Sequence, residues 1–174
     1  MSNKNTEWET HFQEGNSLAN AGKHHNAIEC FELVLDINPA HNLSWNNIGV
    51  AMICLGKYQD ALPNFDRAIK IKPNYKEAYH NRGLALMETG QLQEALKDLS
   101  KSIELDDTYW SAYRHRSILY QMLKKTDASF QDYLSARNLE SKKKPKSIII
   151  ILRDPPELMK KQMAIWETNN ERSI

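Results

Sequence analysis

Residues 42–75 read NLSWNNIGVAMICLGKYQDALPNFDRAIKIKPNY, and this stretch decides the fold. Its first half spaces apolar residues three and four apart, as on one face of a helix: Trp45, Ile48, Met52 and Leu55. Gly56 follows and suits the left-handed conformation that ends many helices. A second amphipathic run then carries its own apolar face: Ala61, Leu62, Phe65, Ala68 and Ile69. The stretch therefore predicts two short helices joined by a tight turn.

The same pattern recurs along the chain with a period of 34 residues. Two series of small residues keep that spacing: Gly15, Gly49, Gly83 and Ser117, and Ala27, Ala61, Ala95 and Ser129. A bulky series follows in phase: Phe31, Phe65, Leu99 and Tyr133. A fourth series marks the predicted end of each first helix: Gly22, Gly56 and Gly90, with Lys124 in the fourth place. Several series in phase over four periods indicate a repeat protein.

The small residues predict close packing of the two helices within each repeat. Gly49 and Ala61 let the helix backbones approach each other, and Phe65 fills the wedge beside them. One such helix pair cannot bury its apolar face alone, so neighbouring pairs are expected to stack on one another.

These residues resemble the tetratricopeptide repeat (TPR) family, which has a 34-residue helix–turn–helix pattern. The second repeat matches that pattern almost completely, with Trp45, Gly49, Met52, Ala61, Phe65, Ala68 and Pro73. The resemblance implies an all-α fold, namely a right-handed α-solenoid of four TPR helix pairs with a C-terminal capping segment. It sets the repeats at 8–41, 42–75, 76–109 and 110–140, with eight helices in antiparallel pairs.

The segments outside the repeats are less regular. Residues 1–7 are predicted as an N-terminal extension, and residues 141–147, with four lysines around Pro145, as a basic linker. Residues 148–174 combine the β-branched run Ile148–Leu152 with a helix that has Met159, Met163 and Trp166 on one face. We expect this tail to cap the fourth repeat, and a homodimer through the tail is an alternative.

Composition narrows the class of function. Of the 174 residues, 41% are hydrophobic and the net charge is +1, which argues against disorder and against a nucleic-acid-binding surface. The sequence has no apolar run of membrane-spanning length, and Met1–Glu9 lacks the pattern of a signal peptide. We therefore expect a cytoplasmic protein with no membrane or nucleic-acid partner.

The sequence shows no recognisable catalytic, cofactor-binding or metal-binding motif. We find no glycine-rich phosphate loop, no GxSxG and no HExxH, and Cys30 and Cys54 fit no metal or redox motif. We therefore expect no enzymatic activity, no cofactor and no metal. The remaining functional feature is a surface.

The resemblance implies that the first helix of each repeat lines a concave groove. Position 6 of the four repeats reads Gln13, Asn47, Asn81 and His115. A side-chain amide carries both a donor and an acceptor, so it can pair with the N–H and C=O of an extended peptide. The row resembles the asparagine ladder of O-linked N-acetylglucosamine transferase, although asparagine is frequent at this position in the family. His115 would make binding mildly pH-dependent near neutrality.

The predicted groove combines amide, apolar and charged side chains: Phe12, Gln13, Asn16, Leu43, Asn46, Asn47, Val50, His80, Asn81, Leu84, Arg114, His115 and Ile118. Chaperone-binding TPR domains clamp a carboxylate with three cations and two asparagines, in slots held here by Phe12, Asn16, Asn47, Glu77 and Asn81. Both asparagine slots match, at Asn16 and Asn47. The cations are missing and Glu77 would repel a carboxylate, so binding of an acidic chaperone tail is disfavoured.

These observations predict a non-enzymatic protein–protein interaction module that binds an extended peptide or a partner protein in its groove. Two alternatives stay open. One is a homo-oligomerising scaffold that uses the tail, and the other is a dedicated secretion or assembly chaperone that uses the same groove.

Overall fold

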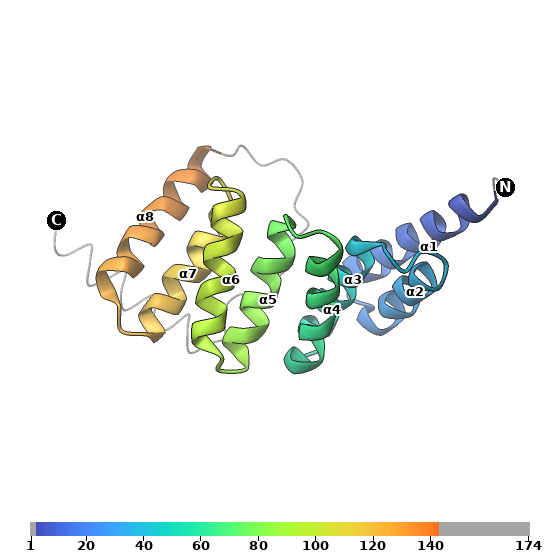
Figure 1. Ribbon diagram of the computed structural model, residues 1–174, viewed down its shortest axis with the longest axis horizontal. Coiled ribbons are helices and arrows are strands. Elements are labelled where there is room, and N and C mark those ends of the chain that lie inside the picture. Colours follow the sequence, from blue (N-terminus) through green and yellow to red (C-terminus); the bar gives the residue numbers. More distant parts are fainter. Residues whose placement is uncertain (1–2, 143–174) are drawn as a thin grey trace. The chain divides into compact units, whose positions relative to one another are not determined.

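The computed structural model describes residues 3–142, which fold entirely into helices and connecting turns (Figure 1). Eight helices follow one another: α1 (Asn3–Asn20), α2 (His24–Ile37), α3 (Asn42–Cys54), α4 (Tyr58–Ile71), α5 (Lys76–Glu88), α6 (Leu92–Leu105), α7 (Trp110–Met122) and α8 (Thr126–Lys142). The all-α fold and the eight helices predicted for residues 8–140 are confirmed.

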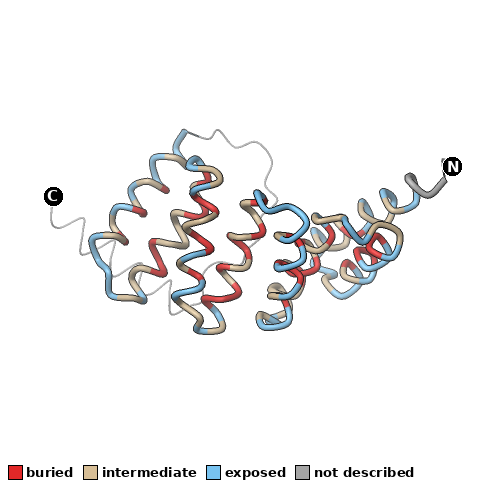
Figure 2. The backbone as a smooth tube through the Cα atoms, viewed as in Figure 1, coloured by how far each residue is buried: buried red, intermediate tan, exposed pale blue. Residues whose placement is uncertain are grey.

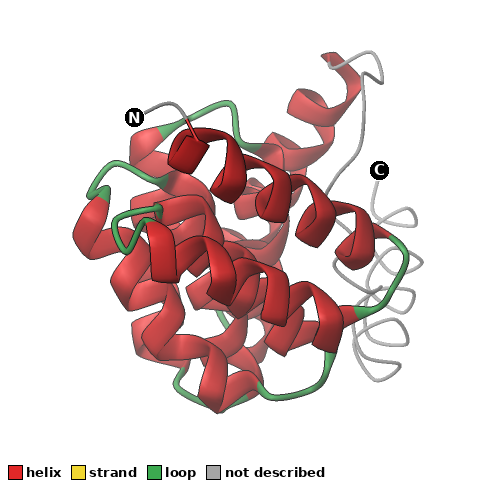
Figure 3. Ribbon diagram, turned by 90° about the vertical axis from the view of Figure 1, so that its right-hand side faces the viewer, coloured by secondary structure: helices red, strands yellow, loops and turns green. Residues whose placement is uncertain are grey.

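The helices pack as hairpins that stack in chain order (Figure 1). Figure 3 shows the same helices from the end of the stack, with loops only at the helix ends. Within each hairpin, α1 packs on α2, α3 on α4, α5 on α6, and α7 on α8. The second helix of each hairpin also packs on the first helix of the next one, and α5 contacts both α3 and α7. These contacts place the first helices in one layer of a helical solenoid.

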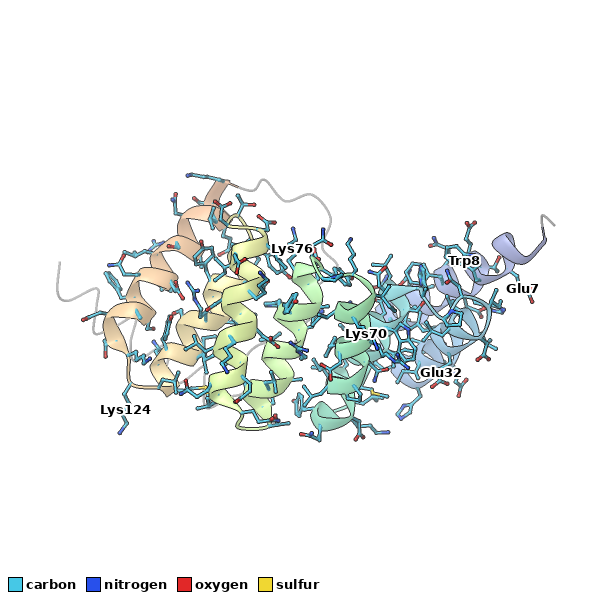
Figure 4. The ribbon with its side chains drawn as sticks, viewed as in Figure 1. Glu7, Trp8, Glu32, Lys70, Lys76 and Lys124 are labelled. Carbon is cyan, nitrogen blue, oxygen red and sulfur yellow. The ribbon has the colours of Figure 1, made fainter. Side chains whose placement is uncertain are left out.

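Each first helix ends in the same turn. Gly22, Gly56 and Gly90 have φ angles of +74°, +76° and +79°, as the sequence predicted for residues that end these helices. In the second repeat, the amide of Lys57 donates to the carbonyl of Met52 (2.9 Å), which closes the last turn of α3. The fourth turn is made by Lys124, at φ +57°, whose side chain points away from the helices (Figure 4).

The core lies between the two helices of each hairpin and also between neighbouring hairpins (Figure 2). Buried clusters join α2 to α3 through Phe31 and Ile48, and α4 to α5 through Phe65 and Ala85. A Cβ atom added at Gly49 would lie 2.6 Å from Cε1 of Phe65, and one at Gly15 would lie 2.7 Å from Cε1 of Phe31. Both phenylalanines are fully buried. The predicted close approach of the helices at the small-residue positions is therefore confirmed.

The helix bounds differ at both ends from the predicted repeats. Helix α1 begins at Asn3, inside the segment predicted as an extension, and α8 runs to Lys142, into the segment predicted as a linker. The predicted strand-like run at Ile148–Leu152 and the predicted helix with Met159, Met163 and Trp166 lie outside the described residues.

Candidate functional site

A row of hydrogen-bonded polar side chains joins all four first helices, and we call this row the ladder. Its members come from α1, α3, α5 and α7: Asn16, Asn46, Asn47, His80, Asn81, Ser111 and His115. Two of its bonds join residues 35 positions apart, because the fifth residue of one repeat meets the sixth residue of the next.

The first half of the ladder is made of asparagines. Asn47 Nδ2 donates to Asn16 Oδ1 (3.0 Å), and Asn46 Nδ2 donates to Asn47 Oδ1 (3.2 Å). Asn81 Nδ2 donates to Asn46 Oδ1 (3.0 Å). Three consecutive repeats are therefore joined through side-chain amides alone.

The second half is made of two histidines. His80 Nδ1 lies 3.2 Å from Asn81 Oδ1, and His80 Nε2 lies 3.0 Å from His115 Nδ1. His115 Nδ1 also lies 2.8 Å from the carbonyl oxygen of Ser111, and the Ser111 hydroxyl lies 3.3 Å from His80 Nε2. This half joins the third repeat to the fourth.

Burial divides the ladder into an inner and an outer part. Asn46, Asn81 and His80 are 5%, 7% and 0% exposed, whereas Asn16 and Asn47 are half-buried. A buried polar group without a partner costs about 1–3 kcal/mol, so the ladder bonds are what allow the inner residues to lie in the interior. The outer amides keep part of their surface in contact with solvent.

The two histidines are held neutral by their surroundings. Burial lowers the pKa of His80 to about 3, with a further contribution from His115. Burial also lowers the pKa of His115 to about 4, with a smaller effect from the charge of Arg114. The sequence-based prediction that His115 titrates near neutral pH is therefore wrong, because the ring is shielded from water.

At the fifth position of the first repeat, aromatic contacts take the place of a ladder residue. Phe12 occupies the position that Asn46 and His80 hold in the next two repeats. Its ring lies 4.8 Å from that of His41 in an edge-on arrangement and 5.8 Å from that of Phe31. The ring of Trp8 also lies 4.8 Å from that of His41. The hydrogen-bonded row consequently begins at Asn16.

Comparisons with known proteins agree with this architecture. Two family profiles described as tetratricopeptide repeats match residues 8–41 and 77–109, and one described as a TPR repeat matches residues 54–90. The chain belongs to the tetratricopeptide repeat family. No curated protein sequence matches it.

Solved TPR structures share the fold. MamA from Desulfovibrio magneticus RS-1 is 24% identical over 77% of this chain and 76% of its own, with a TM-score of 0.70. The first TPR of Spaghetti (RPAP3), bound to the HSP90 peptide SRMEEVD, is 26% identical over 68% of this chain and 94% of its own, with a TM-score of 0.66. YrrB, described as a TPR protein with an unusual peptide-binding site, is 21% identical over 76% and 68%, with a TM-score of 0.66.

The other predicted TPR groove residues differ in exposure. Leu43 is 39% exposed and Gln13 is exposed, whereas Val50, Leu84 and Arg114 are half-buried. Ile118 is only 4% exposed and belongs to the interior. Val50 also packs against the core cluster of Ala61, Phe65 and Ala85. The exposed predicted residues are therefore concentrated in the first two repeats.

Sequence reasoning missed a second recurring set of polar contacts in the TPR solenoid. Arg82 Nε and Nη2 donate to both carboxylate oxygens of Asp98 (2.7 and 2.8 Å), and its Nη1 donates to Asp66 in the preceding repeat (2.6 Å). One repeat later, Arg116 pairs in the same way with Asp132 and reaches Ser100. The 34-residue spacing of these Arg and Asp residues was a usable signal.

Metal-binding clusters and membrane spans are absent from the described part of the chain. Within residues 3–142, we find no group of three or more His, Cys, Asp or Glu side chains arranged to hold a metal ion. In the same range, every helix is too short or too polar to cross a membrane.

Proposed function

We propose that this TPR chain binds an extended peptide segment of a partner protein along the face of its first helices. The observation that carries the proposal is the outer part of the ladder. Asn16 and Asn47 are held in place by a hydrogen bond to each other, yet both are partly open to solvent. They are therefore positioned polar groups on a surface.

The outer amides keep hydrogen-bonding capacity. An amide has two N–H donors and two acceptor lone pairs, and the ladder uses one of each at Asn47. The second donor and the second lone pair can pair with the C=O and N–H of a partner residue. Because an α-helix already uses its backbone groups internally, this mode of binding requires an extended segment.

Exposed apolar side chains on the first helices offer further anchors. Leu43 on α3 is 39% exposed and Met122 on α7 is 40% exposed. A methionine can adapt to differently shaped partner side chains. Main-chain pairing would supply affinity and these apolar contacts would supply selectivity.

The charges on the first helices argue against an acidic C-terminal peptide. RPAP3 in the complex above binds SRMEEVD, whose last four residues include three acidic side chains. In this chain, the slots that hold cations in chaperone-binding TPR domains carry Phe12, Glu77 and Asn81. We therefore propose a neutral or basic internal segment as the partner sequence.

The test is an affinity pull-down, read by mass spectrometry, with a double variant that removes two solvent-accessible amides of the first helices, the ladder residue Asn47 and the exposed Gln13. Gln13→Ala with Asn47→Ala should weaken capture of the partner by tenfold or more, since each lost contact costs about 1 kcal/mol. The matched control is Gln93→Ala with Gln131→Ala, which removes two exposed amides from α6 and α8. Equal capture by both double variants would move the site away from the first helices.

A stability check accompanies that comparison. Gln13 is exposed and Asn47 is half-buried, so the double variant should keep its helical circular dichroism and most of its unfolding free energy. Asn47→Asp at the same position is a second test, because it preserves size and acceptors but removes the donors. A loss of binding with Asn47→Asp in a folded protein would support pairing of Asn47 with a partner carbonyl.

A further inference from the structure

We infer that the hydrogen bonds of the ladder all run in one fixed donor-to-acceptor direction, which the backbone carbonyl of Ser111 sets through the rings of His115 and His80. We infer further that this direction orients an extended peptide with its N-terminus toward the fourth repeat. The second half of the inference rests on the proposed function. The first half concerns the unbound protein alone.

The direction starts at a group that can only accept. The carbonyl oxygen of Ser111 lies 2.8 Å from His115 Nδ1, and a carbonyl has no hydrogen to donate. His115 Nδ1 must therefore carry the hydrogen, since an unprotonated nitrogen would face the oxygen lone pair to lone pair. In a neutral ring, His115 Nε2 is then the unprotonated nitrogen.

The protonated nitrogen of the His80 ring follows from that of His115. His80 Nε2 lies 3.0 Å from His115 Nδ1, and two N–H groups facing each other at that distance would repel. His80 Nε2 is therefore an acceptor, and the Ser111 hydroxyl at 3.3 Å can donate to it as well. The hydrogen of the His80 ring must then lie on Nδ1, which faces Asn81 Oδ1 at 3.2 Å and the Tyr109 hydroxyl at 3.4 Å.

The hydrogen bonds of the asparagines have the same donor-to-acceptor direction. Because Asn81 Oδ1 accepts from His80, its Nδ2 is directed to Asn46 Oδ1 at 3.0 Å. The remaining two bonds, from Asn46 to Asn47 and from Asn47 to Asn16, follow in turn. A reversed Asn81 amide would bring its N–H against the N–H of His80. The side-chain donors from His115 to Asn47 thus all point from the fourth repeat toward the first.

This direction determines how a peptide can lie on Asn47. Its Nδ2 lies on the side of α1, where it bonds Asn16, and its Oδ1 accepts from Asn46. In an extended residue, the N–H and C=O point to the same side, with the N–H nearer the N-terminus. A residue that pairs with both atoms places its C=O over Nδ2, on the side of the first repeat. The peptide then runs from the fourth repeat to the first.

Ring tautomers in the full chain without any ligand test the direction. Long-range ¹H–¹⁵N correlation spectra at pH 7 separate protonated from unprotonated ring nitrogens, with His115→Asn used for assignment and the exposed His25 as the reference ring. His80 and His115 should both be protonated on Nδ1, with a scalar coupling between His115 Nδ1 and His80 Nε2. Protonation on Nε2 in either ring would overturn the fixed direction.

Photo-cross-linking tests the orientation for a partner of any sequence. A benzophenone amino acid is placed at the exposed Gln13 on α1 or at the exposed Met122 on α7, and cross-linked partner residues are mapped by mass spectrometry. Partner residues linked to position 122 should precede, in the partner sequence, those linked to position 13. The opposite order would overturn the orientation.

The two experiments keep the two proposals separate. Capture of a partner with cross-links at neither position would overturn peptide binding on the first helices, and the orientation with it. The tautomers in the free protein would still decide the direction of the ladder.

Discussion

The first two repeats and the last two fill the same 34-residue frame with different chemistry. In repeats one and two, the rings of Phe31 and Phe65 lie against glycines, and Asn47 on α3 donates a hydrogen bond to Asn16 on α1. In repeats three and four, paired histidines join the first helices, and Arg82 and Arg116 bridge the second helices. Repeats three and four thus add ion pairs and histidine contacts to an apolar core that includes the fully buried Leu99 and Leu119, and we call these two repeats the polar half.

This difference shows that the repeat frame specifies positions and leaves the type of contact open. Position 7 is Ile48 in the second repeat, 2% exposed, and Arg82 in the third, paired with Asp98. Both solutions satisfy a position that packs against the second helices. The two halves should therefore respond differently to mutation and to pH.

The largest expected effect on stability comes from breaking an ion pair in the polar half. Arg116→Ala leaves Asp132, which is 6% exposed, without its bidentate partner, and removal of one member of a buried ion pair costs about 3–5 kcal/mol. The control is Lys101→Ala, which removes an exposed ion pair with Glu104 and should cost at most about 1 kcal/mol. Urea unfolding at pH 7 measures both. Equal losses would mean that the Arg116 pair adds no more than a surface contact.

The next largest effect comes from disrupting the packing of phenylalanine against glycine in the first two repeats. Gly49→Leu forces a side chain into the fully buried ring of Phe65, and overpacking of this kind costs about 1–3 kcal/mol or more. In the third repeat, a Cβ at Gly83 would meet Leu99 Cγ at 3.1 Å, a shallower overlap with a branched side chain. Gly83→Ala should therefore be much milder than Gly49→Ala in thermal unfolding. The reverse order would remove this distinction between the halves.

Much of the fold could be predicted from the sequence because its signals are local and repeated. The glycine at each helix end needs only its own backbone conformation, and Gly56 at φ +76° shows it. The contact of Gly49 with Phe65 follows from the helix periodicity of two adjacent segments. The start of α1 at Asn3 was not predicted, because polar residues before the first repeat give no apolar period.

The site could be predicted only in part, for a physical reason. Sequence position placed Asn47 and Asn81 in one row facing a ligand, yet Asn81 is 7% exposed and bonded to Asn46 and His80. The ladder joins residues 35 positions apart, and this spacing depends on how far each repeat is rotated against the next. That rotation is a property of the packed solenoid and not of a single repeat.

The pH dependence of stability should also differ between the two halves, because the buried His80 and the half-buried His115 both lie in the polar half. The pKa values of His80 and His115 are lowered from 6.5 to about 3 and about 4, so the folded state binds fewer protons than the unfolded state. Their contribution is complete above pH 6.5 and is lost as the pH falls toward these folded values, at about 1 kcal/mol per histidine between pH 7 and 5.5.

Urea unfolding of the wild type, His115→Asn and His25→Asn at pH 7 and pH 5.5 measures this effect. His115→Asn should reduce the loss of stability at the lower pH, and His25→Asn, at an exposed position on α2, should leave it unchanged. A wild-type stability that stays constant over this interval would contradict a neutral state of both His80 and His115 in the folded chain.

The smallest effect concerns the turn that differs between the halves. Lys124 adopts φ +57° where the other three repeats have glycine, and a side chain in this region costs about 1–2 kcal/mol. Lys124→Gly removes that strain but gives the unfolded chain more freedom, at about 0.5–1 kcal/mol, so the net gain in stability should be about 0.5 kcal/mol. The reciprocal variant Gly56→Lys should lose stability by a similar or larger amount, since Gly56 lies at φ +76°. Differential scanning calorimetry of both variants checks the pair, and a destabilised Lys124→Gly would show that the lysine side chain stabilises its turn by more than the backbone strain costs.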